Sequence, residues 1–73
     1  MQLTPEEITA LREQAGMTRQ GFSLALGMQE DAVRAWESGR RRPNAAACLG
    51  IALYVKLRET AEGRALLIEA GAL

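Results

Sequence analysis

Apolar positions in this chain recur every three or four residues within short segments, and glycines separate the segments. Ile8, Leu11 and Ala15 follow this spacing, which predicts a helix because side chains three or four positions apart share one helix face. The preceding stretch 4–7, TPEE, is a typical helix start, with threonine as N-cap, proline at the first helical position and glutamate where a capping box needs it. Gly16 is typical of a left-handed helix end.

Two further helices are predicted on either side of the turn LGMQ. Thr18 is a good N-cap for the first of them, and Gly27 is expected to end it in a left-handed conformation. The second covers residues 30–38 and ends at Gly39. The side chains predicted to face inward are Phe22, Leu26, Val33 and Trp36.

The last two helices are predicted after Pro43. Asn44 is expected to cap an alanine-rich fourth helix, and Thr60 to cap a short fifth helix within residues 60–70. Gly50 and Gly63 are expected to weaken these helices locally, although Gly50 equally suits close helix packing. Apolar residues surround much of the fourth helix, which indicates a second buried face; they are Leu49, Leu53 and Leu57 in one stripe, with Ile51, Tyr54 and Val55 displaced around the axis.

The predicted fold class is all-α, because no period-two alternation typical of strands persists. The 73 residues predict one domain, 1–73, with a core at about 4–58. Cys48 is the only cysteine and histidine is absent, so an intramolecular disulfide is excluded and neither a structural zinc nor another cofactor is expected. A chain this short usually needs such support, so self-association is the expected substitute.

The sequence predicts a cytoplasmic protein without a membrane-spanning segment. The longest nearly apolar stretch, 45–55, is too short to cross a bilayer, and the N-terminal residues contain no apolar run of signal-peptide length. No small-molecule ligand is evident. Cys48 is expected to be a small buried residue.

Positive charge is concentrated in one region although the chain has no net charge. Residues 19–42 hold five arginines against three acids, and three of the arginines are consecutive. A local excess of this kind points to an anionic partner rather than to a fold. The arginines are Arg19, Arg34, Arg40, Arg41 and Arg42.

Two helices of about eight residues joined by a short turn that begins with glycine form a helix-turn-helix, whose second helix fits a DNA major groove. The segment MTRQGFSLALGMQEDAVRAWESGRRRP, residues 17–43, resembles the Cro/Xre family of phage-repressor-like helix-turn-helix domains. The matches are Thr18, Phe22, Leu26, Gly27, Met28, Val33, Trp36, Glu37, Gly39, Arg40, Arg41 and Pro43. The resemblance covers residues 4 to about 57 and implies a four- to five-helix, lambda-repressor-like domain.

Four positions depart from the family pattern. Arg19 stands where the family usually has glutamine, Ser23 occupies a small inward site that is usually alanine, and Arg34 stands where many members have serine. Gln29 replaces the serine or threonine that normally caps the recognition helix, which is expected to weaken the start of that helix by about 1 kcal/mol.

The resemblance implies that the recognition helix contacts bases and that the flanking residues contact phosphates. Arg34 is the best candidate for a specific contact, because arginine to guanine is the commonest one. The predicted base contacts are Gln29, Glu30, Asp31, Arg34 and Ala35. The predicted phosphate contacts are Arg19, Gln20, Ser38, Arg40, Arg41 and Arg42, with one of the three consecutive arginines expected to point away.

The roles of several residues in this region stay open. Glu30 and Asp31 can accept from cytosine N4, stabilise the helix N-terminus, or orient Arg34. Ala35 can touch a thymine methyl group or be a passive small residue. Trp36 is expected in the core, and the resemblance implies that Glu37 pairs with a basic residue of the domain, for which Arg12 is the candidate.

The apolar surplus of the last two helices predicts a homodimer that would hold two recognition helices about one DNA turn apart, on a palindromic operator. The predicted interface residues are Leu53, Tyr54, Leu57, Leu66 and Leu67, and the alternative is that the fifth helix packs back on its own core.

The function expected from these features is sequence-specific regulation of transcription by a small dimeric repressor. Autorepression of a phage or mobile-element operon is an extension of this expectation. An antitoxin-like protein-interaction module on the same fold is the alternative. An enzyme is not expected, since the chain contains no nucleophile motif, paired cysteines or phosphate-binding loop.

Overall fold

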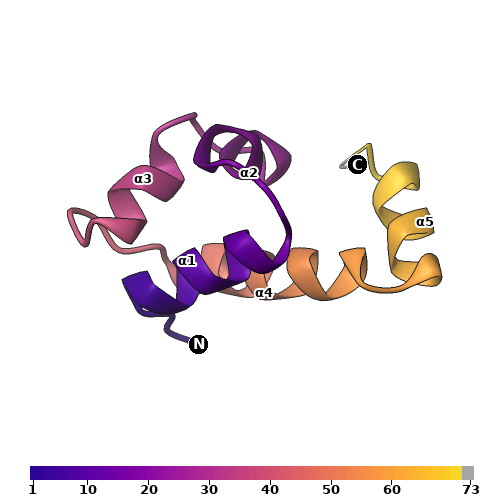
Figure 1. Cartoon of the computed structure of the whole chain (residues 1–73), viewed down its shortest axis with the longest axis horizontal. Coiled ribbons are helices and arrows are strands. Elements are labelled where there is room, and N and C mark those ends of the chain that lie inside the picture. Colours follow the sequence, from indigo (N-terminus) through magenta and orange to yellow (C-terminus); the bar gives the residue numbers. More distant parts are fainter. Residues whose placement is uncertain (72–73) are drawn as a thin grey trace.

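Five helices follow one another along the chain in the computed structural model, which describes residues 1–71, and no strand occurs among those residues (Figure 1). The first helix packs along the long fourth helix, the second and third lie together on one side of this pair, and the fifth extends from the far end of the fourth (Figure 1). The helices are α1 (Pro5–Gln14), α2 (Arg19–Ala25), α3 (Ala32–Glu37), α4 (Ala45–Arg58) and α5 (Ala61–Glu69). This arrangement confirms an all-α, lambda-repressor-like domain.

Side-chain caps start four of the five helices where the sequence predicts them. The Thr4 hydroxyl accepts from the Glu7 backbone N–H at 3.1 Å, and the Glu7 carboxylate accepts from the Thr4 N–H at 2.8 Å, which completes a capping box. Thr18, Asn44 and Thr60 cap α2, α4 and α5 in the same way, each through a backbone N–H three residues on. The recognition helix α3 is the exception, because no side chain of its own caps it.

Glycines end the first three helices. Gly16, Gly27 and Gly39 all have positive φ, at 69°, 73° and 78°. After α2, the Met28 N–H donates to the Ser23 carbonyl at 2.9 Å and the Gly27 N–H to the Leu24 carbonyl at 3.0 Å, which is the Schellman arrangement. The tight reversal that follows sets the angle between α2 and α3.

The core lies where α1, α2, α3 and α4 meet. Phe22 and Tyr54 pack edge to face with their ring centroids 5.9 Å apart, and Trp36 is buried beside them as predicted. The helix α4 turns its Cys48, Ile51, Tyr54 and Val55 side inward. Of the predicted leucine stripe, Leu49 and Leu53 are 50% and 51% exposed, and Leu57 is half-buried.

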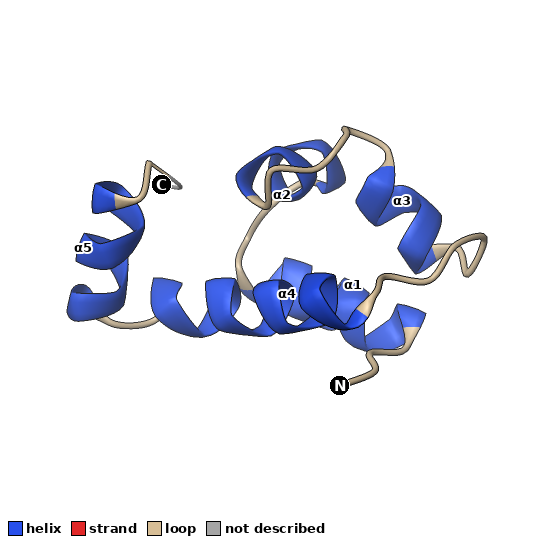
Figure 2. Ribbon diagram, turned by 180° about the vertical axis from the view of Figure 1, so that it is seen from behind, coloured by secondary structure: helices blue, strands red, loops and turns tan. Residues whose placement is uncertain are grey.

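The C-terminal helix α5 packs on the end of α4, as Figure 2 shows from behind. Leu67 belongs to the core cluster, and the Arg64 guanidinium donates to the Arg58 carbonyl at the C-terminus of α4. Gly63 is buried so close to α4 that a Cβ atom there would overlap the Leu57 carbonyl group. Glycine is therefore required at this approach. A Cβ atom at Gly50, by contrast, would have no neighbouring atom within 4 Å, so no other helix packs closely against Gly50.

This packing changes the predicted dimer interface. Tyr54 and Leu67 are 5% and 7% exposed because they complete the core of their own chain, so they offer little surface to a second copy. Leu53 and Leu66 are exposed, at 51% and 55%. Among residues 1–71, no helix is long and apolar enough to cross a membrane.

Candidate nucleic-acid interface

The helix-turn-helix consists of α2, the turn 26–31 and α3. The recognition helix α3 is shorter than predicted, since it begins at Ala32 rather than Glu30 and ends at Glu37. Asp31 occupies its N-cap position but makes no side-chain capping bond. The absence of a side-chain cap agrees with the expectation that Gln29 is a poor substitute for serine or threonine. Instead of starting a helix after Gln29, the chain makes a further turn at residues 30–31 before α3 begins.

Ser23 supplies from α2 the hydrogen bond that α3 lacks. Its hydroxyl accepts from the Val33 backbone N–H at 3.2 Å and donates to the Arg19 carbonyl at 2.8 Å. Val33 is the second residue of α3, so its N–H has no partner within the helix. Ser23 and Val33 are both fully buried, which excludes water as a substitute, and the hydroxyl therefore holds the start of the recognition helix against α2.

The carboxylate of Glu37, at the end of α3, joins three helices. It accepts from Arg12 of α1 at 2.7 Å and from Arg19 of α2 at 2.9 Å. Arg12 also donates to the Met17 carbonyl in the loop between α1 and α2. The Glu37 side chain is 5% exposed and that of Arg12 is 12% exposed, so this is a nearly buried ion pair whose partners are also hydrogen-bonded. The predicted pairing of Glu37 with Arg12 is confirmed.

The two arginines keep Glu37 ionised. Burial by itself would raise the pKa of the Glu37 carboxyl group, but the hydrogen bonds from Arg12 and Arg19 outweigh burial and hold that pKa below its ordinary value. The hydrogen bond to Glu37 in turn raises the pKa of the Arg12 guanidinium.

The exposed side of α3 gathers several of the predicted DNA-contacting residues. A polar hollow of about 270 Å³ is lined by Arg19 of α2, Arg34 and Ser38 at α3, Thr9 of α1, and Glu37 as the buried acid. Gln20, Gln29, Glu30 and Asp31 are also exposed. Within residues 1–71, no carboxylate forms an ion pair with Arg34, Arg41 or Arg42.

The structure removes Ala35 from the predicted set of base contacts. Ala35 is 1% exposed, because it lies on the side of α3 that faces the core, so its methyl group cannot meet a thymine. The two acids among the predicted base contacts, Glu30 and Asp31, precede α3 rather than forming part of it. Asp31 lies 3.9 Å from Arg40, and both side chains are mostly exposed, so this contact contributes little stability.

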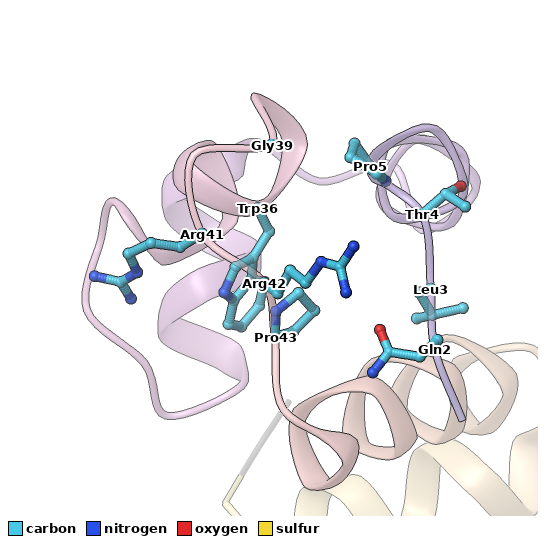
Figure 3. A pocket seen from close by; sticks show the side chains of 9 residues that line it. All are labelled: Gln2, Leu3, Thr4, Pro5, Trp36, Gly39, Arg41, Arg42 and Pro43. Atoms are coloured by element: carbon cyan, nitrogen blue, oxygen red, sulfur yellow. The ribbon is translucent and has the colours of Figure 1, made fainter.

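Two of the three consecutive arginines diverge. Arg41 and Arg42 extend in opposite directions from the loop that follows α3, and Arg42 points toward the N-terminal segment before α1 (Figure 3). The backbone of the loop is held at its start, since the N–H groups of Arg40 and Arg41 both donate to the Ala35 carbonyl, at 3.0 and 3.2 Å. Arg40 and Arg41 therefore stay next to the end of α3.

The chain matches the helix-turn-helix family over residues 8–60, which is well over half of its 73 residues. Comparisons with curated proteins and with solved structures gave no match. The protein belongs to the Cro/C1-type helix-turn-helix family and is a DNA-binding regulator of that type.

Two hydrogen bonds of the interface were not predicted from the sequence. The bond from Ser23 to Val33 joins residues on two different helices, and the sequence marked Ser23 only as an unusual residue at an inward site. Arg19 was assigned to phosphate alone, but its Nε atom is engaged by Glu37. The departure of both positions from the family pattern was the available signal, because each replaces a side chain with one of different hydrogen-bonding capacity.

Ser23→Ala is expected to lower the free energy of unfolding by about 1–2 kcal/mol, because the buried Val33 N–H loses its partner. The matched control is Ser38→Ala, since the Ser38 hydroxyl bonds the Ala35 carbonyl at an exposed helix end where water can replace it. Urea denaturation gives the stability, and amide hydrogen exchange at Val33 gives the site. Unchanged protection of the Val33 amide in Ser23→Ala would contradict the assigned bond.

Glu37→Gln is expected to lose about 2 kcal/mol or more at neutral pH, because two arginines keep their charge without the partner acid. The folded-state pKa of Glu37 is depressed, so its contribution is complete above its unfolded pKa and is lost as pH falls through the folded value. The stability gap between wild type and variant should therefore shrink as pH is lowered from about 6 to below 4. Glu69→Gln, at an exposed position, is the control. A gap that stays constant over this pH range would rule out the assignment.

Proposed function

We propose that the protein is a small dimeric repressor that binds a palindromic operator through α3 and blocks access to the promoter. The observation that carries this proposal is the polar hollow on the exposed side of α3, where Arg19, Arg34 and Ser38 come together. Arg34 has no acid partner among residues 1–71, so its guanidinium is available to a polyanion.

Base recognition is proposed for the exposed residues at α3 and in the turn before it. Arg34 would donate two hydrogen bonds to guanine, and Gln29 would pair with adenine or bind a phosphate. Glu30 and Asp31 are exposed and precede α3. They would accept from cytosine N4, stabilise the helix N-terminus, or orient Arg34. In each of these roles the two acids would weaken nonspecific binding and thereby favour discrimination.

Phosphate binding is proposed for both sides of the recognition helix. On the α2 side, Arg19 keeps 47% of its side chain exposed although Glu37 engages its Nε atom, so the rest of its guanidinium can reach a phosphate beside Gln20. On the other side, Ser38, Arg40, Arg41 and Arg42 would follow the sugar-phosphate backbone as the chain leaves the groove. Glu37 would orient Arg19 rather than contact DNA itself.

Dimerisation is proposed through the outward faces of α4 and α5. The exposed leucines Leu49 and Leu53 are one turn apart on α4, and Leu66 is exposed on α5. Leu57 is half-buried and would lie at the border of this surface. A two-fold arrangement of this kind repeats the recognition helix at about one helical turn of DNA, as a palindrome requires.

Autorepression is a natural extension, because small proteins of this type commonly act on their own promoters. The second candidate is an antitoxin-like module, and the exposed leucines of α4 and α5 support it, since they also suit a different protein partner. The two functions differ in salt dependence. DNA binding should weaken with added salt by about 0.9 log units in affinity per log unit of salt for each phosphate neutralised.

Arg34→Ala is expected to cost about 1–3 kcal/mol of operator affinity and to relax specificity at one base position. Arg41→Ala should weaken binding to all sequences alike and reduce the salt slope by about one. Protection footprinting upstream of the gene would locate the operator, and fluorescence anisotropy at several salt concentrations would measure both variants. A flat salt response of the wild type, with a stoichiometric protein partner, would favour the antitoxin-like alternative.

Leu53→Lys is expected to weaken dimerisation at least tenfold, because a buried ammonium group would replace an apolar contact at the proposed interface. Leu24→Lys is the matched control, since Leu24 is exposed to a similar extent, 55%, but lies on α2. Sedimentation equilibrium measures the dissociation constant. Equal effects of the two substitutions, or a wild type that stays monomeric, would reject this interface.

A further inference from the structure

A cavity of about 440 Å³ lies outside the polar hollow on α3, between the N-terminal segment of the chain and the loop that follows α3 (Figure 3). Residues 2–5 form one side, and the other side is formed by Gly39, Arg41, Arg42 and Pro43, with Trp36 behind them. Its volume falls within the range of small-molecule sites. No local sequence pattern indicates this cavity, because its two sides are more than thirty positions apart along the chain.

The walls of the cavity are mainly apolar. Leu3 and Pro5 face Pro43 across it, and the indole of Trp36 closes the back (Figure 3). Trp36 is 3% exposed and packed in the core, so this wall is rigid. A ligand that fills the cavity must therefore carry an apolar body of modest size.

The polar groups of the cavity favour an anion. The Arg42 side chain points from the loop toward the N-terminal segment, and Gln2 carries its amide toward the loop (Figure 3). Neither the acids of α1 nor any other carboxylate of residues 1–71 forms an ion pair with Arg42. The start of α1 adds few donors to this feature, because Pro5 has no N–H and the capping box already uses the N–H groups of Thr4 and Glu7.

We propose that this cavity binds a small organic carboxylate, with the carboxylate on the Arg42 guanidinium and the apolar body against Leu3, Pro5, Pro43 and Trp36. Arginine provides two parallel N–H donors that match a carboxylate, and Gln2 provides a further amide donor. The apolar walls select against bare inorganic anions, since those leave the walls uncovered.

Such a ligand would also act on DNA binding, and this part rests on the proposed function. Arg42 is one of the proposed phosphate contacts, so a bound carboxylate and a DNA phosphate would compete for the same guanidinium. Linkage requires that the ligand lowers DNA affinity by the same factor by which DNA lowers ligand affinity. The cavity would make DNA binding by this domain responsive to a small carboxylate.

The test titrates the full chain with benzoate at constant ionic strength and follows the emission of Trp36, the only tryptophan of the chain. The Nε signal of Arg42 in the NMR spectrum provides a second readout. A saturable change is expected with benzoate, but not with benzamide, which has the same shape without the charge, nor with acetate, which lacks the apolar body. Arg42→Gln should weaken benzoate binding about tenfold or more, whereas Arg40→Gln, which removes the same charge from the same loop at a residue that does not line the cavity, should change it less than twofold.

Three outcomes would overturn the proposal: no saturable change with benzoate, equal binding of benzamide, or equal loss in Arg42→Gln and Arg40→Gln. A separate arm adds benzoate to the DNA complex of the wild type and of Arg42→Gln, and only the wild type should lose affinity. Benzoate binding without any effect on the DNA complex would support the cavity and reject the coupling. Failure of the wild type to bind DNA would reject the proposed function and leave the ligand titration unaffected.

Discussion

The arrangement of the recognition helix depends on one nearly buried carboxylate. Glu37 ends α3 and is held by Arg12 of α1 and Arg19 of α2, so a single acid fixes three helices relative to one another. Taking this acid out of water is costly unless its oxygens are fully bonded, and the two guanidiniums meet that requirement. The same contact holds Arg19 at the edge of the proposed DNA-binding surface, and stability and function therefore share this ion pair.

A second contact compensates for an irregular start of the recognition helix. Most helices of this domain begin with their own cap, but α3 lacks one and takes its hydrogen bond from Ser23 on the neighbouring helix. The carbonyl of Ser23 also accepts from the turn at Met28, so one residue anchors both ends of the connection between α2 and α3. The helix-turn-helix is consequently tied at its turn by Ser23 and at its far end by Glu37.

Local signals predicted most of the fold. Helix caps and left-handed glycines act within a few residues, so the sequence alone sufficed to locate them. The caps are Thr4, Thr18, Asn44 and Thr60, and the glycines are Gly16, Gly27 and Gly39.

The sequence did not predict how each helix is rotated about its own axis. Apolar residues surround α4 and α5, and only packing decided that Tyr54 and Leu67 face the core while Leu53 stays outside. For the same reason Ala35, on a helix of six residues, was placed on the wrong face. Of the interface itself, the pair Arg12–Glu37 followed from the family resemblance, but bonds between helices such as Ser23 to Val33 have no signature in local spacing.

The close approach of Gly63 to the backbone of α4 determines the direction in which α5 leaves the domain. In a dimer assembled through α5, this direction would set the distance between the two DNA-reading surfaces. A methyl group at residue 63 would overlap the backbone of Leu57 and prevent this approach, and in such a dimer it would thereby alter how the two subunits are joined.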